Sequence, residues 1–155
     1  MEADIPDCLI VGAGPVGLTL GCQFHQYGIA FRIIDKLPGP VKRTKAAAVW
    51  SRTAEIFDQM NLTQRFLEEG VKVFGASFFA GGKRVARLTL DSIDSVHNYV
   101  LMLAQHKTEE VLRTYLEEKG ASVDYNCAVV SVEERDDLVE VTLDNGQTLT
   151  ARYLI

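Results

Sequence analysis

Residues 7–36 of the chain read DCLIVGAGPVGLTLGCQFHQYGIAFRIIDK. The first five of them, residues 7–11, are a short apolar run that stops at a glycine, which is typical of a strand buried on both faces of a parallel sheet. Apolar side chains then recur at helical spacing over residues 15–27, and Gly28 suits the left-handed position that ends a helix. Residues 30–34 form a second apolar run. This order of strand, glycine turn, helix and strand predicts a βαβ unit in an α/β fold.

Three glycines, Gly12, Gly14 and Gly17, follow the first predicted strand and open the predicted helix with the spacing G-x-G-x-x-G. In such a unit Gly12 allows the tight turn, Gly14 leaves room for a pyrophosphate, and Gly17 lets helix and strand pack closely. The first helical turn, which includes Pro15 and Val16, presents unpaired N–H groups and the positive end of the helix dipole to the phosphates. The turn therefore predicts a dinucleotide site. The alternative is a glycine turn that serves packing alone.

An aspartate, Asp35, ends the second predicted strand 18 residues after Gly17. A carboxylate at this position can accept hydrogen bonds from both hydroxyls of an adenosine ribose, and it repels a 2′-phosphate. The site therefore favours FAD or NAD over NADP, with an aspartate that only caps a turn as the alternative. The basic residues Lys42, Arg43 and Lys45 either neutralise a pyrophosphate or form a solvated surface. A P-loop is excluded because its lysine does not follow the glycines.

The rest of the chain predicts both helices and strands. Expected helices cover residues 51–60, with Ser51 as the N-cap, 63–69 and 105–119. The pairs Gly81-Gly82 and Asn145-Gly146 predict hairpin turns. The expected strands outside the βαβ unit are residues 73–79, 83–90, 121–125, 129–133, 138–143 and 148–154. Together these elements predict a Rossmann-like α/β domain with a central parallel sheet and an antiparallel meander and hairpin.

The composition narrows the class of protein. Apolar residues make up 47% of the 155 residues and charged residues 24%, as in an ordinary globular domain. The net charge is −5 and basic residues are interleaved with acidic ones, so nucleic acid is not expected as a partner. Glycines and a proline interrupt the first apolar stretch, so no signal peptide or membrane span is expected, and a cytoplasmic location is predicted.

The cysteines and histidines indicate no metal or redox centre. Cys8, Cys22 and Cys127 are far apart in the sequence and lie in apolar segments, which predicts buried thiols. His25 and His106 are expected on helix surfaces and His97 in a loop. No residue of the chain is identified as a catalytic acid or base.

Residues 7–36 resemble the start of the class A flavoprotein monooxygenases, which are FAD-dependent aromatic hydroxylases, and their variant Gly-Pro-Val-Gly-Leu is typical of that family. The run KAAAVWSRTAEIFDQMNL, residues 45–62, resembles the family segment in which a helix carrying Arg-Thr-x-Glu packs beside FAD. Arg52, Thr53 and Glu55 match that motif.

Further matches extend the site that the resemblance implies. The run LAQHKTEEVLRTYLEEKGASV is similar to the family helix whose glutamine reaches FAD, which implies that role for Gln105. Lys45 stands where the family usually has an arginine. A lysine keeps the positive charge but cannot form the two parallel hydrogen bonds that a guanidinium group makes to a phosphate. The run NCAVVSVEE is similar to the strand whose backbone contacts adenine, which points to Val129. Lys36, which ends the first matching run, is also included in the site.

The resemblance implies FAD as the cofactor, NAD(P)H as its reductant in the complete enzyme, and hydroxylation of a small aromatic substrate. One alternative is an NAD-dependent dehydrogenase domain, and another is a nucleotide-binding remnant without turnover. The family motifs expected after residue 155 are absent, so residues 1–155 are interpreted as the N-terminal part of an FAD-binding domain. Within it, residues 73–103 are expected to begin a substrate domain. Self-association through exposed surfaces is a further expectation.

Overall fold

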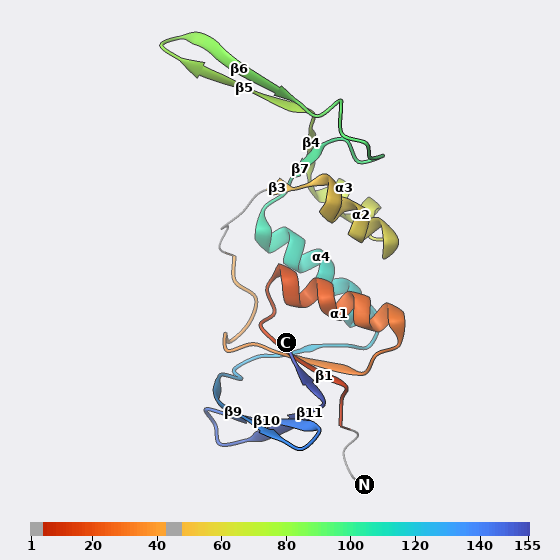
Figure 1. Cartoon of the computed structure of the whole chain (residues 1–155), viewed down its shortest axis with the longest axis vertical. Helices are drawn as coiled ribbons and strands as arrows, with labels where there is room; N and C mark the ends of the chain where they lie inside the picture. Colours follow the sequence, from red (N-terminus) through yellow and green to blue (C-terminus); the bar gives the residue numbers. More distant parts are fainter. Residues whose placement is uncertain (1–4, 43–47) are drawn as a thin grey trace. The chain divides into compact units, whose positions relative to one another are not determined.

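The computed structural model describes residues 5–42 and 48–155, which form two compact units (Figure 1). The first unit joins the chain up to Lys42 with Glu109–Ile155, and the second holds the segment between them. The βαβ unit predicted from the sequence lies in the first unit.

A four-stranded parallel sheet is the centre of the first unit. Its order is β12-β1-β2-β8, and each neighbouring pair is parallel. The strands are β1 (Cys8–Val11), β2 (Phe31–Ile34), β8 (Val123–Asp124) and β12 (Tyr153–Leu154). The predicted parallel sheet is therefore confirmed, and its two central strands, β1 and β2, are those of the βαβ unit.

Helix α1 (Pro15–Tyr27) connects β1 to β2 and packs closely against the sheet. It ends at Gly28, whose φ of 70° is the left-handed conformation expected there. A Cβ atom added at Gly21 would lie 2.7 Å from the Cδ1 atom of Ile33, so α1 lies very near β2. The thiol of Cys22 donates a hydrogen bond to the carbonyl of Leu112 in α4 (Gln105–Glu118). Helix α1 and this part of α4 thus cover one face of the sheet (Figure 1).

The other face of the sheet is covered by an antiparallel meander. It consists of β9 (Val129–Arg135), β10 (Leu138–Leu143) and β11 (Thr148–Ala151) in the order β11-β10-β9. Leu9 and Ile34 of the parallel sheet share one buried cluster with side chains of the meander. The first unit is therefore a three-layer arrangement of helices, parallel sheet and meander.

The expected single strand over residues 148–154 is wrong. Strand β11 pairs with the meander, whereas β12 pairs with β1 in the parallel sheet. The chain changes sheets at Arg152, whose N–H donates to the carbonyl oxygen of Pro6. Apolar residues continue beyond Arg152 into Tyr153 and Leu154, and periodicity alone does not reveal that the pairing partner changes there.

The second unit combines two short helices with a small sheet. The helices are α2 (Ser51–Gln59) and α3 (Thr63–Glu69), both close to their predicted bounds. Two strands that the sequence analysis missed, β3 (Ala48–Val49) and β7 (Val100–Met102), pair with β4 (Val71–Val73) in the order β3-β7-β4. Strands of two or three residues are too short for a periodic signal.

A hairpin extends from this second unit, as the Gly81-Gly82 turn predicts (Figure 1). Its strands are β5 (Gly75–Ala80) and β6 (Lys83–Thr89). The expected strand over residues 73–79 begins two residues too early, because Val73 pairs with Val100 in the other sheet.

Two local expectations have different outcomes. Ser51 is not the N-cap of α2: Trp50 takes that position, and the Ser51 hydroxyl donates instead to the carbonyl oxygen of Tyr99. The three cysteines are free and buried, as predicted.

We expect the aromatic pair Phe57 and Phe66 to stabilise the second unit. Their rings stack at 4.0 Å between centroids, and Phe66 is 2% exposed. Phe66→Ala should therefore lower the free energy of unfolding by about 3–5 kcal/mol, measured by urea denaturation. The matched control is Phe79→Ala, because Phe79 is 66% exposed and its loss should change that free energy by no more than about 0.5 kcal/mol. Equal losses for the two variants would contradict this assignment of the core.

Candidate functional site

The glycine turn lies at the carboxyl end of β1, between the two halves of the parallel sheet. Strand β2 follows on one side of β1 and β12 lies on the other. The N–H of Gly12 donates a 2.8 Å hydrogen bond to the carbonyl oxygen of Ile34, and the N–H of Val11 donates a 2.7 Å bond to the carbonyl oxygen of Ile155. Ligands of open α/β sheets bind outside the carboxyl ends of the strands at the point where the strand order reverses. The turn occupies that point.

The three glycines of the turn meet different structural demands. Gly12 has a φ of 113°, which residues with a side chain rarely adopt. A Cβ atom at Gly17 would lie 2.0 Å from the carbonyl oxygen of Gly12, so the fold itself requires a glycine there. At Gly14 the φ is −77°, and an added Cβ atom would meet no protein atom within 4 Å. Neither backbone conformation nor packing therefore explains the glycine at position 14.

The first turn of α1 is open and contains no acidic residue. Gly14 is the N-cap, and among the described residues no side chain caps the helix or places a carboxylate in its first turn. The first intrahelical bond runs from the N–H of Leu18 to the carbonyl oxygen of Gly14. Val16 in the first turn is 83% exposed. The positive end of the helix dipole thus faces solvent, where a phosphate group would be stabilised.

Asp35 bonds to the turn itself, which the sequence analysis missed. Its Oδ2 atom accepts a 2.7 Å hydrogen bond from the N–H of Ala13, and its Oδ1 atom accepts a 2.8 Å bond from the N–H of Leu37. Sequence spacing placed Asp35 at the end of β2 but could not show which groups it touches.

Backbone bonds of Asp35 connect two further segments to the site. Its N–H donates to the carbonyl oxygen of Asp124 at 2.9 Å, and its own carbonyl accepts from the N–H of Cys127 at 2.9 Å. Between these partners lies Tyr125, and burial raises the pKa of its hydroxyl while Arg113 opposes that shift. Val129, the first residue of β9, follows two residues after Cys127. The structure thus connects the predicted adenine-contacting strand to Asp35 through the Cys127 bond.

The remaining predicted site residues have various locations. Lys36 follows Asp35 and is exposed. Gln105 is the first residue of α4 and belongs to the second unit. Lys45 lies outside the described residues.

The second unit contains the Arg-Thr-x-Glu segment on α2. Arg52 donates to Glu55 at 2.8 Å and Ser95 donates to the same carboxylate at 2.7 Å. These bonds, that from Arg52 foremost, lower the pKa of Glu55. His97 lies in a loop, as expected, but is 7% exposed and has its Nδ1 atom 3.1 Å from the hydroxyl of Tyr99. The neighbours of His97 in the sequence are polar and apolar in turn, and they gave no signal that its side chain is buried.

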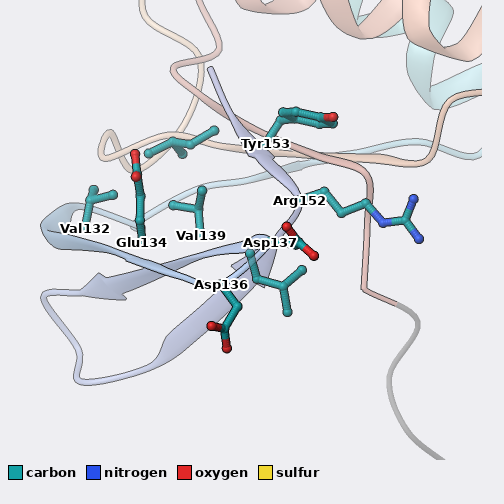
Figure 2. Close-up of a pocket in the computed structure, with 9 residues that line it drawn as sticks. Val132, Glu134, Asp136, Asp137, Val139, Arg152 and Tyr153 are labelled. Carbon is teal, nitrogen blue, oxygen red and sulfur yellow. The ribbon is translucent and has the colours of Figure 1, made fainter.

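A cavity of about 950 Å³ lies elsewhere in the first unit, and Figure 2 shows the side chains that line it. It is lined by apolar and charged side chains, including Val132, Val139, Glu134, Arg152 and Tyr153. None of the predicted cofactor-binding residues lines this cavity. It is therefore distinct from the glycine turn.

Neither a metal centre nor a membrane span is found in the part of the chain that the structure describes. Residues 5–42 and 48–155 hold no group of three or more histidine, cysteine, aspartate or glutamate side chains placed to bind a metal ion. No helix in those ranges is long and apolar enough to cross a bilayer.

Comparison with known sequences gives matches along almost the whole chain. The family model described as an FAD binding domain matches residues 6–155. Rifampicin monooxygenase from Streptomyces venezuelae is 33% identical over 149 residues, which cover 96% of this chain and 31% of that protein. Rifampicin monooxygenase from Rhodococcus hoagii is 35% identical, with 96% and 30% covered. The chain thus spans about a third of the length of these curated relatives.

Comparison with solved structures supports the fold. The anhydrotetracycline hydroxylase of Streptomyces rimosus matches with a TM-score of 0.80 and 34% identity, covering 96% of this chain and 30% of that one. The p-nitrophenol 4-monooxygenase of Pseudomonas putida matches with a TM-score of 0.87 at 24% identity, covering 97% and 40%. The second likeness shows the shared fold alone, and both confirm the predicted Rossmann-like architecture.

The glycine turn, the aspartate after β2 and the match over residues 6–155 agree on one assignment. The chain belongs to the FAD-binding-domain family of the flavin-dependent monooxygenases, and its cofactor is FAD.

Proposed function

We propose that this chain is the FAD-holding part of a flavin-dependent monooxygenase that uses NAD(P)H and hydroxylates a small aromatic substrate. The observation that carries the proposal is the open space at Gly14, beside an uncapped helix start. Of the three glycines, this is the one that neither backbone conformation nor packing requires. A ligand that approaches the backbone closely, such as a pyrophosphate, accounts for it.

Under this proposal each site residue has a binding role. The turn from Gly12 to Gly17 receives the pyrophosphate, and Asp35 receives the adenosine ribose. The backbone at Val129 contacts adenine, and Gln105, Lys36 and Lys45 contact other parts of FAD. These residues bind and orient the cofactor, while the bound flavin supplies the redox and oxygen chemistry.

The substrate class rests on the relatives. The relatives named above at 30% identity or more act on rifampicin and anhydrotetracycline, by their names. The hairpin β5–β6 is proposed to begin a substrate-binding layer, as expected for residues 73–103. Phe78 and Phe79 on β5 are exposed, and a two-stranded hairpin is marginally stable without a further partner. These exposed side chains also support the expected self-association.

The dehydrogenase alternative is not favoured. After β8 the chain forms the antiparallel meander β9–β11, whereas a dinucleotide-binding domain of that class continues with alternating strands and helices. A cytoplasmic location and the absence of nucleic-acid and membrane partners stay predictions, as does the choice between NADH and NADPH.

The first test measures which part of FAD the chain recognises. Because the turn and Asp35 are proposed to hold the adenosine diphosphate half, the protein should bind FAD and ADP, measured by isothermal titration calorimetry. FMN has the flavin but no adenosine, and should bind at least tenfold more weakly than FAD, about 1.4 kcal/mol. Equal affinities for FMN and FAD, or no binding of ADP, would contradict the proposal.

The second test separates ligand space from packing space within the turn. Gly14→Val fills the open position, so ADP affinity should fall by at least about tenfold while the free energy of unfolding changes by no more than about 0.5 kcal/mol. Gly17→Ala adds a methyl group against the carbonyl oxygen of Gly12, and should lower that free energy by about 1–3 kcal/mol.

Calorimetry and urea denaturation of both variants measure these effects. A folded Gly14→Val protein with unchanged ADP affinity would remove the turn from the site.

A further inference from the structure

We infer that Asp35 has a second role beside the proposed ribose contact: its carboxylate holds the glycine turn in the binding geometry before a ligand arrives. The inference rests on the proposed function, because the geometry in question is that of the dinucleotide site. In this role Asp35 is a positioning residue that acts through the backbone of Ala13.

The carboxylate bridges two backbone segments. Oδ2 accepts the N–H of Ala13 at 2.7 Å, and Oδ1 accepts the N–H of Leu37 at 2.8 Å. Hydrogen bonds to a charged acceptor are shorter and stronger than neutral ones, and both distances lie in that range. One side chain thus ties the turn after β1 to the loop after β2.

Asp35 is itself held firmly by its main chain. Its N–H and carbonyl bond to Asp124 and Cys127, both at 2.9 Å. The neighbouring residue Ile34 accepts the N–H of Gly12 at 2.8 Å. The carboxylate therefore projects from a fixed point of the sheet, and successive residues of the turn, Gly12 and Ala13, are anchored to successive residues of β2 and its end.

The turn needs such an anchor because Ala13 lies between two glycines. Glycine has the greatest backbone freedom of any residue, and Gly14 has no protein atom within 4 Å of where a Cβ atom would lie. Without a fixed partner at Ala13, binding would have to order this segment at an entropic cost, which weakens affinity.

The two roles of Asp35 are compatible. An ionised carboxylate offers about four lone-pair positions, and two are used by Ala13 and Leu37. The remaining positions are available to ribose hydroxyls. The two roles can be separated with a ligand that has no ribose hydroxyls. If Asp35 only binds the ribose, removing its side chain leaves the affinity for that ligand unchanged. If Asp35 also positions the turn, removing the side chain lowers that affinity.

The decisive experiment compares ADP with 2′,3′-dideoxy-ADP on the wild-type protein and on Asp35→Ala. If Asp35 also positions the turn, the variant should bind dideoxy-ADP about tenfold more weakly than the wild type does, because the anchor is lost whatever the sugar. The Asp35→Ala variant should lose more affinity for ADP than for dideoxy-ADP, because the contact to the ribose hydroxyls is lost together with the anchor. Unchanged affinity for dideoxy-ADP would overturn the inference.

Amide hydrogen exchange of Ala13 provides a readout that requires no ligand. We expect the Ala13 amide to be protected in the ligand-free wild type and to exchange at least about tenfold faster in Asp35→Ala. Asp35→Asn keeps the size of the side chain but places an NH₂ group against one of the two backbone donors. It should therefore release either Ala13 or Leu37. An unprotected Ala13 amide in the wild type would overturn the inference without any variant.

A matched control is available at the opposite end of the same strands. Asp7 precedes β1, and its Oδ2 atom accepts the N–H of Ala30 at 3.3 Å. Asp7→Ala removes a carboxylate with a similar backbone bond, and should leave both Ala13 exchange and ADP affinity unchanged. Equal effects of Asp7→Ala and Asp35→Ala would show a general loss of stability and overturn the positioning role.

The same data separate this inference from the proposed function. A wild-type protein that binds no ADP contradicts the proposed function, while Ala13 exchange still decides whether Asp35 anchors the turn. If Asp35→Ala loses affinity for ADP but not for dideoxy-ADP, the positioning role is contradicted and the proposed function is not.

Discussion

The contact between Gly17 and the carbonyl oxygen of Gly12 is the constraint on which the first unit depends. A Cβ atom at Gly17 would lie 2.0 Å from that oxygen, so helix α1 can begin where it does only with hydrogen in place of a side chain. This close approach places the start of α1 next to the carboxyl end of β1. It also lets α1 cross to β2 near enough for Gly21 to contact Ile33. The parallel pairing of β1 and β2 follows from that crossover.

The site is a product of this arrangement and needs few specialised side chains. The turn contributes backbone N–H groups and open space at Gly14, and the helix contributes its dipole. Asp35 is the one charged side chain that bonds to the turn among the described residues. Because its main chain is also bonded to β8 and to the segment before β9, one residue connects all the parts that are proposed to surround the adenosine.

The structural features that the sequence did not predict share a physical cause. Each depends on a contact with a residue that is distant in the sequence. Ser51 fits an N-cap by residue type, but the helix begins one residue earlier and its hydroxyl bonds to Tyr99, 48 positions away. His97 lies in a loop but is 7% exposed, and its Nε2 atom lies 3.9 Å from the Asp58 carboxylate of α2. Local propensity contains no information about such partners.

The sequence by itself determined the βαβ unit, the glycine turn, the aspartate after β2 and the membership in an FAD-binding family. These depend on local spacing and on residue types that steric rules restrict. Tertiary structure alone decided that residues 148–154 divide between two sheets, and that Asp35 bonds to the N–H of Ala13. Both outcomes depend on which segment lies alongside another, and an apolar period or a motif spacing is the same whichever partner the chain meets.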